Sequence, residues 1–359
     1  MPTTDSSMAE LMMTNGNDRV HRLVQKLRRR KFMIYGTDRF VVIGHRRRDR
    51  IEALARRLAE GGATVEHTPS FTVCRTPWGA RPLILHTYDA ASIDEDLPPV
   101  IKTELGELEG LIESPQAFGD LLFSIIASVT LGSDDIDCSG VARERLGFVP
   151  WRYYGRNTMA RLRRLLEHPP IDEEAHRSHI VQFAAIYGWV LDNLRGASYL
   201  DVGTSLGFLP FVLSEQRPWA EIVGCDNRPE VIDCARDVAK ELGYDQVRFS
   251  VRDVRDPEFC LRGRFDTVIA VHLLEHMTVE ETRTATANLL GAARKRLILV
   301  VPYEKELQPL YGHQQVFTGE RLEALGGWCV DHLRAAGFWI EEVQGGGLVI
   351  EQPNALARS

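Results

Sequence analysis

The sequence predicts an α/β protein whose second half is a doubly wound, mainly parallel sheet of seven strands. After Gly196, strand and helix patterns alternate strictly, as parallel strands with crossover helices require. Glycine or acidic residues follow the first three of these strands, where an open parallel sheet binds its ligands. The first half predicts a small α/β unit, which is followed by a helical connecting region.

The length of 359 residues favours two or three cores, since it exceeds one typical domain. With 44% hydrophobic and 26% charged residues, the chain has the composition of an ordinary globular protein. We expect a disordered tail, a small α/β domain, a helical connector or lid, and a ligand-binding domain, with boundaries at 1–17, 18–97, 98–170 and 171–356.

Cysteine usage and hydropathy predict a cytoplasmic protein. The six cysteines form no C-x-x-C pair, and no charged-then-apolar leader opens the sequence, so we expect reduced thiols. The longest nearly apolar stretch, Leu121 to Leu131, is well short of the roughly 20 residues that span a bilayer. We therefore expect no membrane partner.

The charge distribution disfavours nucleic acid as a partner. A net charge of -7 and a pI near 5.9 lack the positive field that phosphate contacts require. Residues 19–60 nevertheless hold fourteen Lys or Arg against four acids. This basic region is a solvated helix face, or it pairs with the acid-rich stretch Asp89 to Asp120, or it is a site for phosphate groups of a substrate.

The residue patterns of the first half predict one helix and four strands. Apolar residues at helical spacing predict a helix over Arg48–Glu60, which ends at Gly61-Gly62. Strands are expected at Phe40–Ile43, Ala63–His67, Phe71–Arg75 and Pro82–His86. Because no glycine-rich phosphate loop follows the first strand, we assign this unit no nucleotide.

Residues 98–195 have mostly helical patterns, with breaks at Gly132–Asp135 and Pro169-Pro170 and a long amphipathic helix over Ser178–Leu194. The aromatic cluster Trp151-Arg152-Tyr153-Tyr154 has two interpretations. It covers a substrate site and excludes water, or it forms a core between domains. Residues 20–170 are accordingly expected to supply substrate walls or a contact in a homo-oligomer.

Seven strands are expected in the second half, and the last two form a hairpin across Gly345–Gly347. They are Ser198–Gly203, Ile222–Asp226, Val247–Val251, Phe265–Val271, Leu297–Val301, Trp339–Val343 and Leu348–Glu351. The first of them leads into the loop Asp201-Val202-Gly203-Thr204-Ser205-Leu206-Gly207, whose small residues let a ligand approach the backbone. Asp226-Asn227 ends the second strand and suits ribose hydroxyls, while Asp253-Val254 follows the third and suits a purine edge.

These motifs, in this order and spacing, resemble those of class I S-adenosylmethionine-dependent methyltransferases over residues 171–351. The resemblance implies S-adenosylmethionine as cofactor. It implies that Asp201 and the loop residues Gly203, Thr204, Ser205 and Gly207 face the methionine part. It places Asp226, with Asn227, at the ribose and Asp253, with Val254, at the adenine. Ser205 stands where the family has glycine, and we expect a modest local adjustment there.

Each of these residues also has a structural interpretation. Gly203 and Gly207 would then only turn the chain, Asp226 would cap a helix, and Asp253 would lie in a surface turn. For Glu275 and Asp266 we favour the structural interpretation, because Asp266 begins its strand at the end opposite the expected site.

Three histidines are the candidate catalytic residues. The segment Phe265–His276 resembles the fourth motif of the family and contains His272 and His276; Gly312–Thr318 resembles a late active-site loop and contains His313. His272 should also line the cofactor site. A histidine is the natural base if the acceptor is a hydroxyl, whereas an amine or thiolate acceptor needs only positioning. No His, Asp or Glu cluster has metal-ligand spacing, so we expect a metal-independent in-line displacement.

The resemblance implies O- or N-methylation of a small molecule, such as a natural product or a sugar-like compound. Two other functions remain open. A dinucleotide oxidoreductase also places an acid after a glycine turn, but G-x-G-x-x-G is absent. A catalytically inactive methyltransferase-like protein would serve as a binding or scaffold subunit, with its basic region as a docking surface.

Overall fold

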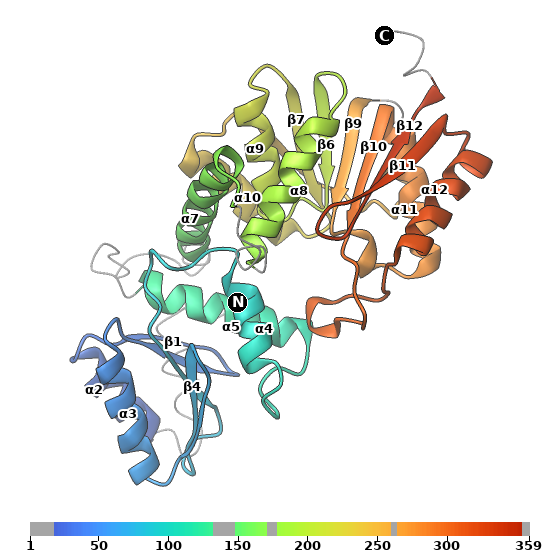
Figure 1. Cartoon of the computed structure of the whole chain (residues 1–359). Helices are drawn as coiled ribbons and strands as arrows, with labels where there is room; N and C mark the ends of the chain where they lie inside the picture. The colour runs from blue at the N-terminus through green and yellow to red at the C-terminus, as the bar shows by residue number, and fades with distance from the viewer. Residues whose placement is uncertain (1–17, 132–147, 171–177, 260–263, 354–359) are drawn as a thin grey trace. The chain divides into compact units, whose positions relative to one another are not determined.

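The computed structural model describes residues 18–131, 148–170, 178–259 and 264–353. The chain divides into two compact units, Met1–Thr158 and Met159–Ser359, each with its own sheet (Figure 1). The expected tail, residues 1–17, lies outside the described residues. None of the helices that the structure describes is long and apolar enough to cross a membrane.

The N-terminal unit contains a five-stranded mixed sheet in the order β1-β2-β5-β4-β3, in which only β2 and β5 run parallel. Its strands are β1 (Met33–Gly36), β2 (Val41–Gly44), β3 (Thr64–His67), β4 (Phe71–Arg75) and β5 (Leu83–His86). Its helices are α2 (Asp18–Arg28), α3 (Arg48–Glu60), α4 (Leu97–Leu105), α5 (Pro115–Leu131) and the first half of α7 (Phe148–Glu167).

Helices cover both faces of this sheet. Ile51, Leu54 and Leu58 of α3 pack with Ile43 and Leu85 in one apolar core. Side chains alternate along a strand, so His86 points to the face opposite Leu85. There its Nε2 lies 2.9 Å from Ser128 Oγ of α5.

Two features of the N-terminal half differ from the sequence prediction. The prediction missed α2 and β1, whose apolar patterns are short. Helix α5 contacts β1 and β2, so part of the expected connector packs on the small sheet. Helix α7 ends at Glu167, in agreement with the predicted break at Pro169-Pro170, whereas the predicted break at Gly132–Asp135 lies outside the described residues.

The C-terminal unit contains a seven-stranded sheet in the order β11-β12-β10-β9-β6-β7-β8. Strand β12 runs in the direction opposite to the other six strands of this sheet. The strands are β6 (Ser198–Val202), β7 (Glu221–Asp226), β8 (Arg248–Val251), β9 (Phe265–Val271), β10 (Ala293–Val301), β11 (Gly337–Glu342) and β12 (Gly346–Glu351). The predicted doubly wound, mainly parallel sheet and its closing hairpin are confirmed.

Helices pack on both faces of this sheet as well. They are α8 (His179–Asn193), α9 (Phe208–Gln216), α10 (Pro229–Leu242), α11 (Val279–Ala292) and α12 (Gly319–Leu333), with short turns η3 (Pro257–Phe259), η4 (Leu274–His276) and η5 (Pro309–Tyr311). Leu200 and Val202 of β6 pack with α11 and α12. The strand order reverses between β6 and β9, so the ends of these strands leave space for a ligand.

Candidate functional site

A pocket of about 400 Å³ opens at the carboxyl ends of the central strands of the C-terminal sheet. Four successive strand ends, those of β6, β7, β8 and β9, contribute to it. Its lining residues are Val202, Gly203, Ser205, Asp226, Asn227, Arg228, Arg252, Asp253, Val254, Arg255, His272, Leu273, His276, Met277 and Tyr311. Seven of the predicted cofactor residues and two of the predicted catalytic histidines are therefore neighbours.

The loop after β6 turns across the end of β7. The backbone N–H groups of Gly203 and Thr204 both donate to the carbonyl oxygen of Cys225, at 2.8 and 3.0 Å. Gly203 has φ +79°, and a Cβ atom added there would lie 2.9 Å from Cδ1 of Leu273. A glycine is thus required by the backbone and by close packing.

Asp226 is an acidic residue that lines the pocket. Its side chain is largely buried, with a relative exposure of 6% for the residue. Oδ2 accepts a hydrogen bond from the backbone N–H of Ser205 at 3.3 Å, and Oδ1 accepts one from that of Arg228 at 3.1 Å. These contacts aim the carboxylate. Oδ1 also accepts from Nε of Arg228 at 3.2 Å, so Oδ2 keeps a free lone pair for a ligand hydroxyl, and a hydroxyl at Oδ1 would share that oxygen with Arg228.

Asp253 lines the pocket but is strongly engaged by the protein. Arg255 Nη2 donates to its Oδ2 at 2.6 Å, and Arg255 Nε donates to its Oδ1 at 2.9 Å. This guanidinium holds the pKa of Asp253 below its usual range. Arg255 in turn pairs with Glu281 at 2.9 Å. A ligand at this acid would share it with Arg255.

Three predicted cofactor residues do not line the pocket. Asp201 is 4% exposed, and burial raises its pKa to about 7. Thr204 is also buried. Gly207 has φ +89°, and a Cβ atom there would lie 2.6 Å from Cζ of Phe249. Close packing and backbone conformation, rather than approach to the pocket, account for this glycine.

His272 lines the pocket where β9 ends. Its φ is +50°, and its backbone N–H donates to the carbonyl of Val300 at 2.9 Å. The ring lies 5.4 Å from that of Phe183, and its buried Nε2 has no hydrogen-bond partner among the described residues. Burial lowers the pKa of His272 to about 3, and three nearby histidines, His179, His313 and His276, lower it further.

His276 and His313 come together from segments far apart in the sequence. Their ring centroids are 4.8 Å apart and their planes almost perpendicular. His313 Nδ1 lies 2.8 Å from Oε2 of Glu304. Burial lowers the pKa of His276 to about 4. The pocket lining includes His276 but not His313.

Glu275 lies beside these two histidines and is 1% exposed. Neither of its carboxylate oxygens has a hydrogen-bond partner among the described residues, and burial raises its pKa to about 8. One ligand atom from each of Glu275, His276 and His313 lies within 4.8 Å of the others. We expected a metal-independent site because no cluster of metal ligands is visible in the sequence spacing. The fold brings such a cluster together, so that argument no longer holds.

Sequence reasoning missed the basic and aromatic residues of the pocket, Arg228, Arg252, Arg255 and Tyr311. The first three lie within two residues of Asp226 or Asp253, so their proximity to these acids was the available signal. Asp266 has the structural role that we expected. It accepts a hydrogen bond from the backbone N–H of Ala197 at 2.9 Å and pairs with Arg294 and Lys295.

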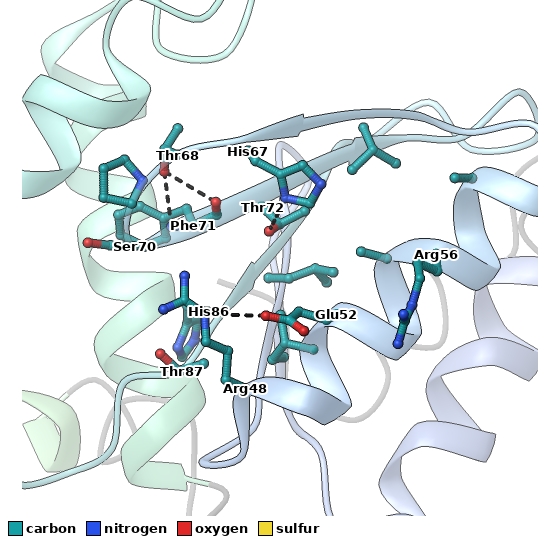
Figure 2. Close-up of a pocket in the computed structure, with 16 residues that line it drawn as sticks. Arg48, Glu52, Arg56, His67, Thr68, Ser70, Phe71, Thr72, His86 and Thr87 are labelled. Carbon is teal, nitrogen blue, oxygen red and sulfur yellow. Dashed lines mark hydrogen bonds and ion pairs between the residues drawn. The ribbon is translucent and has the colours of Figure 1, made fainter.

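A second pocket, of about 480 Å³, lies between α3 and strands β3, β4 and β5 of the N-terminal unit (Figure 2). Its polar side chains contact one another: Arg48 pairs with Glu52 at 3.5 Å, and His67 Nδ1 lies 3.0 Å from Thr72 Oγ1. We assign it no ligand.

The C-terminal segment is similar to known proteins. Residues 193–344 match the model of a family described as a methyltransferase domain. One relative, magnesium-protoporphyrin O-methyltransferase of Synechocystis sp., is 28% identical over 133 residues. That match covers 36% of this chain and 55% of the relative, so the chain spans about half the length of the curated relative it matches.

Solved structures with a similar fold include magnesium protoporphyrin IX methyltransferase of Synechocystis with bound SAM and the protein PH0226 of Pyrococcus horikoshii. The first is 22% identical with a TM-score of 0.37, covering 56% of this chain and 93% of that one. The second is 18% identical with a TM-score of 0.38, covering 51% of this chain and 93% of that one.

Proposed function

We propose that this chain transfers a methyl group from S-adenosylmethionine to a small-molecule acceptor, since residues 193–344 match the model of a methyltransferase-domain family. The observation that carries the proposal is the placement of the buried Asp226 carboxylate beside Gly203 and Ser205, in a pocket where four strands end. This is the ligand position of a doubly wound sheet.

The pocket has the features that the cofactor needs. A volume of about 400 Å³ falls within the range of ligand pockets, which is roughly 300 to 1,000 Å³. Asp226 offers carboxylate oxygens to the two ribose hydroxyls, and Gly203 leaves room for the methionine part. Asn227 and Val254 border the same pocket, where the ribose and adenine would lie.

Methyl transfer from the sulfonium is an in-line displacement. A lone pair of the acceptor forms the new bond to the methyl carbon, while the carbon–sulfur bond breaks and its electron pair stays on sulfur. The products are S-adenosylhomocysteine and the methylated acceptor, whose proton leaves to a base or to water. The protein therefore has to align the two reactants and exclude water.

A small molecule is the acceptor class that the observations favour. The relative from Synechocystis is named for O-methylation of magnesium-protoporphyrin, which is a small molecule. His272 and His276 border the pocket and are neutral at pH 7, because burial lowers their pKa values to about 3 and about 4. An acceptor hydroxyl or amine beside them meets neutral ring nitrogens rather than a positive charge.

Calorimetry with S-adenosylhomocysteine tests the cofactor assignment. The Asp226→Ala variant should bind about 1 to 3 kcal/mol more weakly, roughly 5- to 140-fold, because the ribose hydroxyls lose a charged acceptor. Asp233→Ala is the matched control, since Asp233 is an exposed acid on α10 that pairs with Arg236.

NAD⁺ is titrated into the same protein as a comparison. Binding of NAD⁺ in place of S-adenosylhomocysteine would favour an oxidoreductase, and binding of neither would favour a scaffold protein. Equal affinities of the two Asp variants for S-adenosylhomocysteine would contradict the place given to Asp226.

A further inference from the structure

Two segments of the C-terminal unit bring metal-ligand side chains together next to the pocket. Glu275 and His276 lie in η4, directly after β9, and His313 follows η5. One ligand atom from each lies within 4.8 Å of the others. The chain separates His276 from His313 by more than thirty residues, so the sequence spacing does not show the cluster.

Hydrogen bonds fix these two segments to each other. The backbone N–H of Gln314 donates to the carbonyl of Glu275, and its side-chain amide donates to the carbonyl of His276, both at 2.7 Å. The Gln315 side chain donates to the carbonyls of Leu274 and Met277 at 3.0 and 2.9 Å. The cluster is therefore built on a fixed backbone.

The environment of the Glu275 side chain is the observation that points to a ligand. Its carboxylate is almost fully buried, and neither oxygen has a hydrogen-bond partner among the residues that the structure describes. A buried carboxyl group without a partner is costly, because it gives up its hydrogen bonds to water and gains none in return. A cation bound between Glu275 and the two imidazoles removes that cost.

The surroundings of His313 suit a metal ligand as well. Its Nδ1 lies 2.8 Å from a carboxylate oxygen of Glu304. When Nδ1–H donates to that carboxylate, Nε2 carries the free lone pair and the ring orientation is fixed. A carboxylate behind a ligating histidine is the usual arrangement in metalloproteins.

We propose that Glu275, His276 and His313 bind a divalent transition-metal ion, with Zn²⁺ as the best match. Two imidazoles and one carboxylate are a ligand set that zinc takes in catalytic sites, whereas Mg²⁺ and Ca²⁺ prefer oxygen ligands alone. Ligands at about 2.1 Å from zinc stand about 3.4 Å apart in a tetrahedron, so the side chains close slightly on binding. His276 is partly exposed and has room to turn.

Three protein ligands leave a fourth position open, and His276 borders the proposed cofactor pocket. A role of the ion in catalysis rests on the proposed function. In that reaction the ion would hold an acceptor hydroxyl or amine and favour loss of the acceptor proton. Metal binding itself does not depend on that function, so it is tested separately.

The test uses the full chain after treatment with a chelator, titrated with Zn²⁺ by calorimetry and with Co²⁺ by visible absorption. We expect one equivalent of either ion, and Co²⁺ bands of tetrahedral or five-coordinate geometry. Glu275→Gln and His313→Ala should each lose this binding. His332→Ala should retain it, because His332 is an exposed histidine on α12.

Two measurements distinguish the loss of a metal ligand from a folding defect. Glu275→Gln keeps the shape of the side chain and removes its capacity to act as a carboxylate ligand, so it should fold with an unchanged circular dichroism spectrum. Glu304→Gln should weaken Zn²⁺ binding on the order of 10- to 100-fold without abolishing it, since Glu304 positions His313 only.

Each result either supports or contradicts the proposed metal site. If the wild-type chain takes up no stoichiometric Zn²⁺, or if folded Glu275→Gln binds it as tightly as His332→Ala does, the metal site is wrong. Stoichiometric binding that requires Glu275 and His313, in a chain that fails to bind S-adenosylhomocysteine, would support the metal site and contradict the proposed function.

Discussion

Two residues at the pocket have a backbone conformation that non-glycine residues seldom adopt. Ser205 has φ +49° and His272 has φ +50°, and they follow the ends of β6 and β9. The left-handed region is unfavourable for residues with a Cβ atom, and such strain persists where the surrounding structure imposes it. Both residues lie where the cofactor and the acceptor are proposed to meet.

Replacing Ser205 with glycine should relieve this strain. The adjustment that we expected at Ser205 is its left-handed backbone, for which glycine is better suited. We predict that Ser205→Gly raises the free energy of unfolding by about 1 kcal/mol in urea denaturation. Ser205→Ala, the matched control, keeps a Cβ atom and should show no gain. A loss of stability in the glycine variant would mean that the serine side chain compensates for its backbone.

Burial of His86 should make the N-terminal unit sensitive to acid. Burial lowers the pKa of His86 from 6.5 to about 3, so the folded state keeps this ring neutral while the unfolded chain takes up a proton below pH 6.5. Stability is therefore lost as the pH falls from about 6.5 towards 3. For this residue alone, the free energy of unfolding should be about 2 kcal/mol lower at pH 5 than at pH 7.

Denaturation curves at pH 5 and pH 7 measure this effect. His86→Gln should lose this part of the pH dependence, whereas a substitution of the exposed His67, also in the N-terminal unit, should keep it. An unchanged pH dependence in a folded His86→Gln variant would show that His86 already binds its proton in the native state.

At the residue scale, the sequence predicted the pocket better than it predicted the histidine cluster. Gly203, Ser205 and Asp226 follow strand ends, so the topology of a parallel sheet was enough to bring them together. The cluster depends on hydrogen bonds from Gln314 to η4, which no local pattern encodes. Gly207 met the same motif criteria as Gly203, yet its environment is the ring of Phe249.

At the scale of single elements, the start of α11 is linked to the pocket. Thr278 and Glu281 form a capping box, in which the Thr278 hydroxyl accepts from the Glu281 N–H and the Glu281 carboxylate accepts from the Thr278 N–H. Glu281 also pairs with Arg255, which holds Asp253. The helix start, the arginine and the pocket acid thus share one network.

Loss of the cap should weaken α11. We predict that Thr278→Ala lowers the free energy of unfolding by about 1 kcal/mol, because an N–H group of the first turn loses its acceptor. Thr284→Ala, at an exposed position in the same helix, should change stability by less than about 0.5 kcal/mol. If both variants unfold alike in urea, the capping box contributes nothing measurable.

Strand boundaries show what local patterns leave out. The prediction began β10 at Leu297, but the strand starts at Ala293, because its first residues pair beyond the continuous apolar run. The missed β1 has one buried residue, Met33, and pairs with β2 as an edge strand. An edge strand with little burial lacks the hydrophobic signal on which such predictions depend.

At the scale of the whole molecule, every residue that lines the proposed cofactor pocket belongs to the unit Met159–Ser359. Helix α7 crosses the boundary, and its Arg163 pairs with Glu215 of α9 at 2.7 Å. A fragment should therefore begin at Phe148, where α7 starts, rather than near Pro170. The Trp151 ring, 5.5 Å from Tyr154 and 6.1 Å from Phe123, has its partners within the N-terminal unit.

We predict that the fragment 148–359 binds S-adenosylhomocysteine with the affinity of the full chain but loses turnover of the true acceptor. The reason is that the preceding residues are proposed to supply substrate walls or a contact between copies of the chain. Calorimetry and a methyl-transfer assay on both proteins check this. If the fragment turned over the acceptor at the rate of the full chain, the N-terminal unit would have no role in catalysis.

The position of β12 has a consequence for how the C-terminal unit is made. This strand lies between β10 and β11, although it is the last of the three in the chain. During synthesis, the hydrogen-bonding edge of β10 remains open until residues 346–351 leave the ribosome, and an open apolar edge invites pairing with other nascent chains. Ribosomes that stall before this strand should therefore release an aggregation-prone product, even though every residue lining the cofactor pocket has already been translated.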